Sequence, residues 1–145
     1  MGAKAERGAH VFGLRVYYED TDLAGIVYYA NYLKFIERGR TEALIAGGVD
    51  QGRLQAEAGI VFAVRRVEAD YLAPARLQDE LTVATRLIAL AGARIDLAQE
   101  VRRGGEALFR AAVRLAAIGR DGRPVRVPGP VRAALAGMGA AGEAP

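Results

Sequence analysis

The sequence predicts an α+β fold in which one long helix covers one face of an antiparallel sheet. Between residues 31 and 46, apolar side chains recur at the spacing of a buried helix face. Further along, segments 81–90 and 94–102 alternate apolar and polar side chains, which is the period of a half-buried strand. Short turns separate the later segments, and strands joined by short turns pair antiparallel. The helix is then left to cover one face of the sheet.

We expect a single domain over residues 1–145. The chain is 52% hydrophobic and 26% charged, and its length suits one domain with a buried core. No internal repeat or linker divides it. Residues 1–9 and 138–145 are rich in glycine and alanine, so we expect loose termini at both ends.

Composition excludes several functional classes. The longest uncharged stretch, 23–33, is too short for the roughly 20 apolar residues of a membrane helix, and the first residues lack the apolar core of a signal peptide. The absence of cysteine excludes thiolate chemistry and fits a reducing compartment, so we expect a cytoplasmic protein. His10 is the single histidine and lies in the start that we expect to be exposed and inert. Catalysis would therefore depend on carboxylates or tyrosines.

Charge indicates a small phosphorylated partner. The net charge is +3, and all basic residues except Lys4 and Lys34 are arginines. Arginine binds phosphate through paired hydrogen bonds, but this charge is too small for a dedicated nucleic-acid binder.

The elements follow in order. We expect a first strand over 11–18, a polar break, and a helix over 31–46 that Asn31 caps and Gly47-Gly48 end. A loop over 49–59 leads to a strand that ends near Pro74. The strands 81–90 and 94–102 come next.

The segment 106–119 is ambiguous. Its alanine content and spacing favour a helix, whereas the Gly104-Gly105 turn delivers it beside the preceding strand. We predict a strand because pairing often overrides propensity. A short helix over 131–138 would end the fold.

The densest functional signal lies at residues 17–32, where three acids and five of the six tyrosines meet at a strand–loop–helix junction. A purely structural interpretation stays open, with the acids solvating a turn and the tyrosines packing the core. A calcium loop starting at Asp20 fails, because Ala24 and Asn31 occupy two required ligand positions.

The string YYEDTDLAGIVYYANYLKFIERGRTEAL, residues 17–44, resembles the hotdog-fold acyl-CoA thioesterases of the 4-hydroxybenzoyl-CoA thioesterase family, in particular the YbgC branch associated with the Tol-Pal system. The order of D-x-D, G-I-V-Y, A-N-Y and E-R-x-R-x-E carries the resemblance, which continues more weakly to about residue 130. One departure is Tyr29, where YbgC-type members often carry histidine.

The resemblance implies a five-stranded antiparallel sheet wrapped around one long helix. It also implies a homodimer or homotetramer that holds an acyl-CoA, or an acyl carrier protein, at a subunit interface without a metal or cofactor. Asp22 would be the nucleophile or general base, and the Tyr29 backbone N–H would bind the oxyanion. Glu37 would face the acyl pocket, although a structural contact with Arg40 or Thr41 is the alternative.

The same family tends to contact the CoA phosphates through late arginines, and we select Arg94 and Arg126, for which a solvated surface charge is the alternative. Two competing functions remain. A hydratase or dehydratase would need a histidine beside its acid, and His10 is badly placed for that role. A noncatalytic acyl-thioester binding module would not require Asp22.

Overall fold

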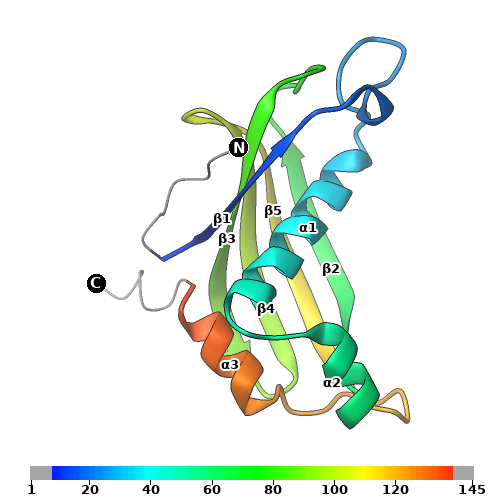
Figure 1. Cartoon of the computed structure of the whole chain (residues 1–145), viewed down its shortest axis with the longest axis vertical. Helices are drawn as coiled ribbons and strands as arrows, with labels where there is room; N and C mark the ends of the chain where they lie inside the picture. Colours follow the sequence, from blue (N-terminus) through cyan, green and yellow to red (C-terminus); the bar gives the residue numbers. More distant parts are fainter. Residues whose placement is uncertain (1–7, 139–145) are drawn as a thin grey trace.

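The chain forms a five-stranded antiparallel sheet with a long helix lying across one face (Figure 1). The computed structural model describes residues 8–138. The strand order is β1-β3-β4-β5-β2, so β1 and β2 are the edges. The strands are β1 (His10–Arg15), β2 (Val61–Tyr71), β3 (Glu80–Ala91), β4 (Arg94–Arg103) and β5 (Glu106–Ile118). The helices are α1 (Asn31–Ala46), α2 (Gln51–Ala58), α3 (Gly129–Ala136) and the short 3-10 turn η1 (Tyr18–Asp20). The predicted fold class is confirmed.

The core lies between α1 and the inner face of the sheet. One face of α1 is buried, including Phe35 and Ile36, and it packs mainly over β1, β3 and β4. Gly39 permits this close approach, because a Cβ at this position would lie 2.5 Å from a methyl carbon of Val83. The helix therefore covers only part of the inner face and leaves β2 beside it.

A buried glutamine joins α1 to the sheet. The Gln99 Nε2 atom donates to the Ile36 carbonyl and to the Thr85 hydroxyl, both at 2.9 Å. Its Oε1 atom accepts from Arg40 Nη1 at 3.1 Å. Every polar atom of this buried side chain thus has a partner, as burial of an amide requires.

Three of the predicted elements differ in the structure. The last helix, expected over 131–138, is α3 and spans Gly129–Ala136, two residues earlier. The loop expected over 49–59 contains α2, because the Asp50 carboxylate accepts from the Arg53 N–H at 3.0 Å and caps the helix, which ends at Gly59 with φ of 69°. The first strand ends at Arg15, earlier than expected, because the chain turns into η1 at Tyr18.

The ambiguous segment 106–119 is the strand β5, as predicted, and it pairs with β4 on one side and β2 on the other. The long helix has the predicted bounds, but Asn31 does not cap it. Ala30 occupies the cap position, and the Asn31 amide instead donates to the Asp20 carbonyl at 2.9 Å.

The ends of the described range are held in place. Residues 1–7 and 139–145, within the termini expected to be loose, lie outside the described residues. Met138 is buried, and its carbonyl accepts from the Leu87 N–H at 2.8 Å. The expectation of an exposed His10 is wrong. His10 begins β1 and is half-buried, and this burial lowers its pKa, although the nearby Glu42 carboxylate opposes the shift.

No helix within residues 8–138 is both long and apolar enough to cross a membrane.

Candidate active site

The loop before α1 places its two aspartates in different surroundings. Asp20 is buried, its carboxylate accepts from the Tyr17 N–H at 2.8 Å, and its carbonyl accepts from the Tyr28 N–H at 2.9 Å. Asp22 is exposed, and one of its carboxylate oxygens, Oδ1, accepts from the Ala24 N–H at 2.9 Å. Asp20 therefore holds the loop together, whereas Asp22 presents its carboxylate to solvent.

A tight turn fixes the position of Asp22. The Asp22 N–H donates to the Ile26 carbonyl at 2.9 Å, and the Gly25 N–H donates back to the Asp22 carbonyl at 3.0 Å. Gly25 has φ of 81°, a conformation that favours glycine over residues with side chains. The carboxylate is consequently carried on a hydrogen-bonded turn rather than on an open loop.

The segment 72–79 supports this turn from the side. The Val27 N–H donates to the Ala75 carbonyl at 2.8 Å, and the Ala75 N–H donates to the Tyr32 hydroxyl at 3.0 Å. These bonds tie the loop before α1 to the connection between β2 and β3.

Asp79 is the last residue of the segment 72–79. Its carboxylate accepts from the Arg76 N–H and from Arg103 Nη1, both at 2.8 Å. Partial burial alone would raise the pKa of Asp79, but these two hydrogen bonds outweigh it and lower the pKa.

The start of α1 offers a free backbone donor. The Tyr28 carbonyl accepts from the Asn31 N–H at 2.8 Å, and the Tyr29 carbonyl accepts from the Tyr71 hydroxyl at 3.0 Å. Within residues 8–138, no acceptor is found for the Tyr29 N–H itself. The helix dipole favours negative charge at this end, so the predicted oxyanion donor is available.

An apolar cavity of about 340 Å³ adjoins this donor. Its lining comes from the loop before α1, from α1, from the last residue of β2 and from the connection that follows it, and consists of Ile26, Val27, Tyr29, Tyr32, Tyr71, Leu72, Ala73 and Pro74. The cavity suits an uncharged group such as an acyl chain. Asp22 is not part of the lining, but it lies on the turn that leads into it.

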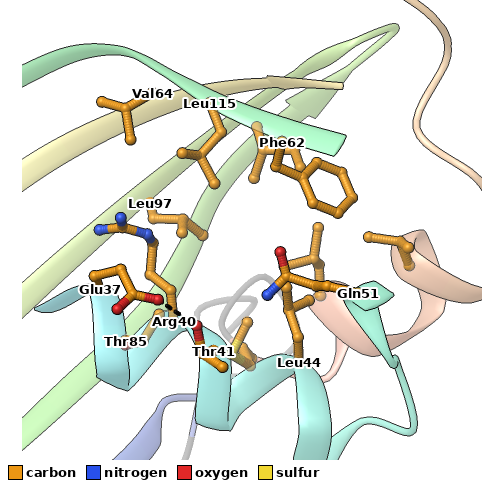
Figure 2. A pocket seen from close by; sticks show the side chains of 14 residues that line it. Glu37, Arg40, Thr41, Leu44, Gln51, Phe62, Val64, Thr85, Leu97 and Leu115 are labelled. Carbon is orange, nitrogen blue, oxygen red and sulfur yellow. Dashed lines mark hydrogen bonds between the residues drawn. The ribbon is translucent and has the colours of Figure 1, made fainter. Parts of the chain in front are cut away.

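Glu37 lies at a second, smaller cavity of about 120 Å³ between α1, β2 and α3 (Figure 2). Its carboxylate accepts from the Thr41 hydroxyl at 2.6 Å, and Arg40 also lines this cavity. Glu37 therefore lines a cavity and contacts Thr41, and its predicted role at an acyl pocket stays a prediction. The two cavities share no lining residue, so a single chain does not bring Glu37 together with Tyr29.

The two selected arginines lie on adjacent segments. The Val127 N–H donates to the Gly92 carbonyl at 3.0 Å, which brings the segment carrying Arg126 beside the β3–β4 turn and Arg94. Arg94 is paired with Asp96, with 3.3 Å between Nε and Oδ2. Arg126 is exposed and makes no ion pair with another described residue. Neither arginine lines either cavity described above.

Figure 1 shows that these arginine-bearing segments and the Asp22 loop lie at opposite ends of the sheet. The β3–β4 turn lies near α2 and α3, whereas the loop before α1 lies at the other end, beside the segment 72–79. Within one chain, the predicted site residues thus form two groups, those of the Asp22 loop and the two arginines.

The sequence interpretation missed Tyr71. It is the sixth tyrosine and lies outside the motif at 17–32, but its hydroxyl and ring both reach Tyr29. The only signal was an aromatic residue at the end of a strand, which is common in cores and points to no particular partner.

Comparisons with known proteins agree with this geometry. A family model described as the thioesterase-like superfamily matches residues 16–135. The acyl-CoA thioesterase YbgC of Haemophilus influenzae is 40% identical over 125 residues, which cover 86% of this chain and 92% of that protein. The acyl-CoA thioester hydrolase YbgC of Escherichia coli O6:H1 is 43% identical over 88 residues, or 61% of this chain and 65% of that protein.

A solved structure extends the similarity to three dimensions. A probable thioesterase from Bartonella henselae has a TM-score of 0.80 and 39% identity, covering 83% of this chain and 99% of that chain. The matched family region spans α1, the strands β2 to β5 and the loop that carries Asp22. The resemblance seen at residues 17–44 is confirmed, and the chain belongs to the thioesterase-like superfamily and, within it, to the hotdog-fold acyl-CoA thioesterases of the YbgC branch.

Proposed function

We propose that this chain hydrolyses an acyl-CoA thioester to CoA and a carboxylic acid, with Asp22 as nucleophile or general base. The observation that carries the proposal is the exposed Asp22 carboxylate on the same short loop as the Tyr29 N–H, which has no acceptor among residues 8–138. An apolar cavity for the acyl group adjoins that loop.

The general-base route needs only groups on this loop. Asp22 takes a proton from water, the resulting hydroxide attacks the thioester carbon, and the Tyr29 N–H binds the oxyanion that forms. When the intermediate collapses, the C–S bond breaks, and the CoA thiolate takes up the proton that Asp22 removed from water, which restores the Asp22 carboxylate. In the nucleophilic route, the Asp22 carboxylate attacks the same carbon, expels the thiolate and forms a mixed anhydride that water then hydrolyses.

We propose that two copies of the chain share the site. The edge strand β2 presents unpaired backbone groups, and Val64, Val67 and Tyr71 on it are between 38% and 49% exposed. An antiparallel pairing of β2 with its copy around a two-fold axis would place its Val61 end opposite the partner's other end. The Asp22 loop of one copy would then lie near the Glu37 cavity and the arginine segments of the second copy.

We propose two kinds of partner for this site, CoA and an acyl carrier protein. Arg126, and to a smaller degree the ion-paired Arg94, would contact the CoA phosphates. An acyl carrier protein could present a similar thioester to the same loop. We place the reaction in the cytoplasm, because the lack of cysteine fits a reducing compartment.

The test is a turnover screen of the purified protein with short, long, branched and aromatic acyl-CoAs, following free thiol release. We expect turnover of at least one group and a clear preference among them. Binding of acyl-CoA with no thiol release from any substrate would contradict hydrolysis and indicate a binding module instead.

A further inference from the structure

A tyrosine from outside the motif holds the backbone of the proposed oxyanion site. Tyr71, the last residue of β2, donates its hydroxyl hydrogen to the Tyr29 carbonyl at 3.0 Å. The bond joins the edge of the sheet to the turn that begins α1. It also borders the apolar cavity, which both side chains line.

This contact fixes a peptide plane. A peptide carbonyl and the N–H that follows it lie in one plane and point in opposite directions. The bond from Asn31 to the Tyr28 carbonyl thereby orients the Tyr29 N–H, and the bond from Tyr71 to the Tyr29 carbonyl orients the Ala30 N–H. Neither of these two N–H groups has an acceptor among the residues that the structure describes.

The Tyr71 side chain is itself firmly placed. Its ring packs edge-on against Phe109 at 5.0 Å and Tyr32 at 5.6 Å between centroids, and both of those side chains are buried. The next residue, Leu72, donates its N–H to the Leu108 carbonyl at 2.8 Å. Desolvation and the neighbouring Tyr29 and Tyr32 raise the pKa of Tyr71, so the hydroxyl keeps its proton at neutral pH.

We propose that Tyr71 is a positioning residue for thioester hydrolysis, whose hydroxyl holds the Tyr29–Ala30 peptide so that the Ala30 N–H meets the developing oxyanion beside the Tyr29 N–H. The inference rests on the proposed function, because it assigns Tyr71 a task in the same reaction. Tyr71 acts through the backbone, since its hydroxyl donates to the Tyr29 carbonyl.

The expected effect is on turnover rather than on binding. Oxyanion donors act most strongly when charge develops on the carbonyl oxygen, so a poorly held donor lowers kcat more than it raises KM. Deleting such a donor costs about 10²–10³-fold in kcat. A donor that remains but is held less well should cost less, roughly 10-fold.

The experiment compares Tyr71→Phe with Tyr18→Phe. Tyr71→Phe removes one hydroxyl and keeps the ring, and Tyr18→Phe makes the same change on a side chain that is 84% exposed and lines neither cavity. We would measure kcat and KM on the acyl-CoA that the wild type turns over fastest, hydrogen exchange over residues 28–33, and the melting temperature. All kinetics would be run well below the lowest melting temperature.

For Tyr71→Phe we expect kcat about 10-fold lower, KM within about twofold, and faster exchange over residues 28–33. Tyr18→Phe should match the wild type in all three. An unchanged kcat in Tyr71→Phe, a raised KM at unchanged kcat, or a lower kcat with unchanged exchange would each overturn the positioning role. A wild type without turnover on any acyl-CoA would overturn the proposed function and this inference together. If the wild type is active, the results for Tyr71→Phe test the inference alone.

Discussion

At the scale of single residues, Asp20 and Asp22 are identical side chains that the fold places in different surroundings. They are two positions apart in the sequence, and neither charge nor spacing distinguishes them. The family resemblance selected Asp22, and the physical difference between them appears only in the folded loop, where Asp20 is buried and Asp22 is exposed. Burial of the Asp20 carboxylate depends on contacts that a linear pattern does not contain.

Residues that act across the sequence could not be predicted. Tyr71, the last residue of β2, contacts the loop before α1, and Asp79, in the connection between β2 and β3, binds Arg103 of β4. The sequence next to either residue does not indicate these partners. The family resemblance assigns the oxyanion role to the Tyr29 N–H, and this role stays a prediction. Because the proposed donor is a backbone N–H, any side chain at Tyr29 would leave it in place.

Asp79 makes stability depend on pH at the acidic end. Its pKa is lower in the folded chain than its ordinary value of 3.8, so its hydrogen bonds stabilise the fold above that value. This stability is lost as the pH falls from 3.8 through the lower folded pKa. We expect Asp79→Asn to be less stable than the wild type at pH 7 and to approach it near pH 3. Urea unfolding at both pH values measures this difference.

Glu57→Gln serves as the control, because in the described part of the chain the Glu57 carboxylate pairs with Arg53 alone, on the exposed face of α2. It should follow the wild type at both pH values. A constant difference between Asp79→Asn and the wild type across the whole range would show that Asp79 stabilises by another route.

At the scale of elements, regular patterns predicted well, the alanine-rich β5 was predicted correctly although its pattern was ambiguous, and the short helix α2 was missed. The spacing of apolar residues in α1 and the alternation of apolar and polar residues in β4 each reflect one buried face. Each element can therefore be recognised from its sequence. For β5 the pattern fitted both a helix and a strand, and pairing with β4 and β2 decides. The helix α2 was missed because it buries no residue and so has no apolar face to recognise.

Gly39 tests the packing of α1 against β3. A Cβ at this position would lie 2.5 Å from Val83, and forcing extra carbon into a packed core costs about 1–3 kcal/mol. We expect Gly39→Ala to lower the free energy of unfolding by that amount, although alanine favours helix. Gly137→Ala, where the nearest atom is 3.6 Å away, should leave the free energy of unfolding nearly unchanged or raise it slightly. Equal stability of both variants in urea unfolding would contradict close packing at Gly39.

At the scale of the whole molecule, the two groups of site residues at opposite ends of the sheet favour a shared site. We expect a dimer or larger species at assay concentration, held in part by the exposed apolar residues of β2. Val67→Glu, on this edge strand, should shift the protein toward monomer and reduce activity in parallel. Ile88→Glu, at a side chain on β3 that is 58% exposed against 38% for Val67, should remain at least dimeric. Light scattering measures both, and a fully active monomer would contradict the shared site.

The nucleotide end of the substrate gives a separate prediction. Arg126→Ala should raise KM for acyl-CoA several-fold with little change in kcat, because a remote phosphate contact is made equally in ground and transition states. Arg94→Ala should have a smaller effect, since Arg94 is already paired with Asp96. Steady-state kinetics on one substrate at fixed ionic strength separates the two, and unchanged KM in both variants would place the phosphates elsewhere.

The most direct measurement of the central claim is the turnover number of Asp22→Asn beside that of Asp20→Asn, from thiol release at saturating acyl-CoA. We predict that Asp22→Asn lowers kcat by roughly 10²–10⁴-fold at an unchanged melting temperature, because it removes the base or nucleophile. Asp20→Asn should lower kcat far less and instead reduce the melting temperature, because Asp20 holds the loop. Equal losses of kcat in the two variants, or full activity in Asp22→Asn, would contradict the assignment.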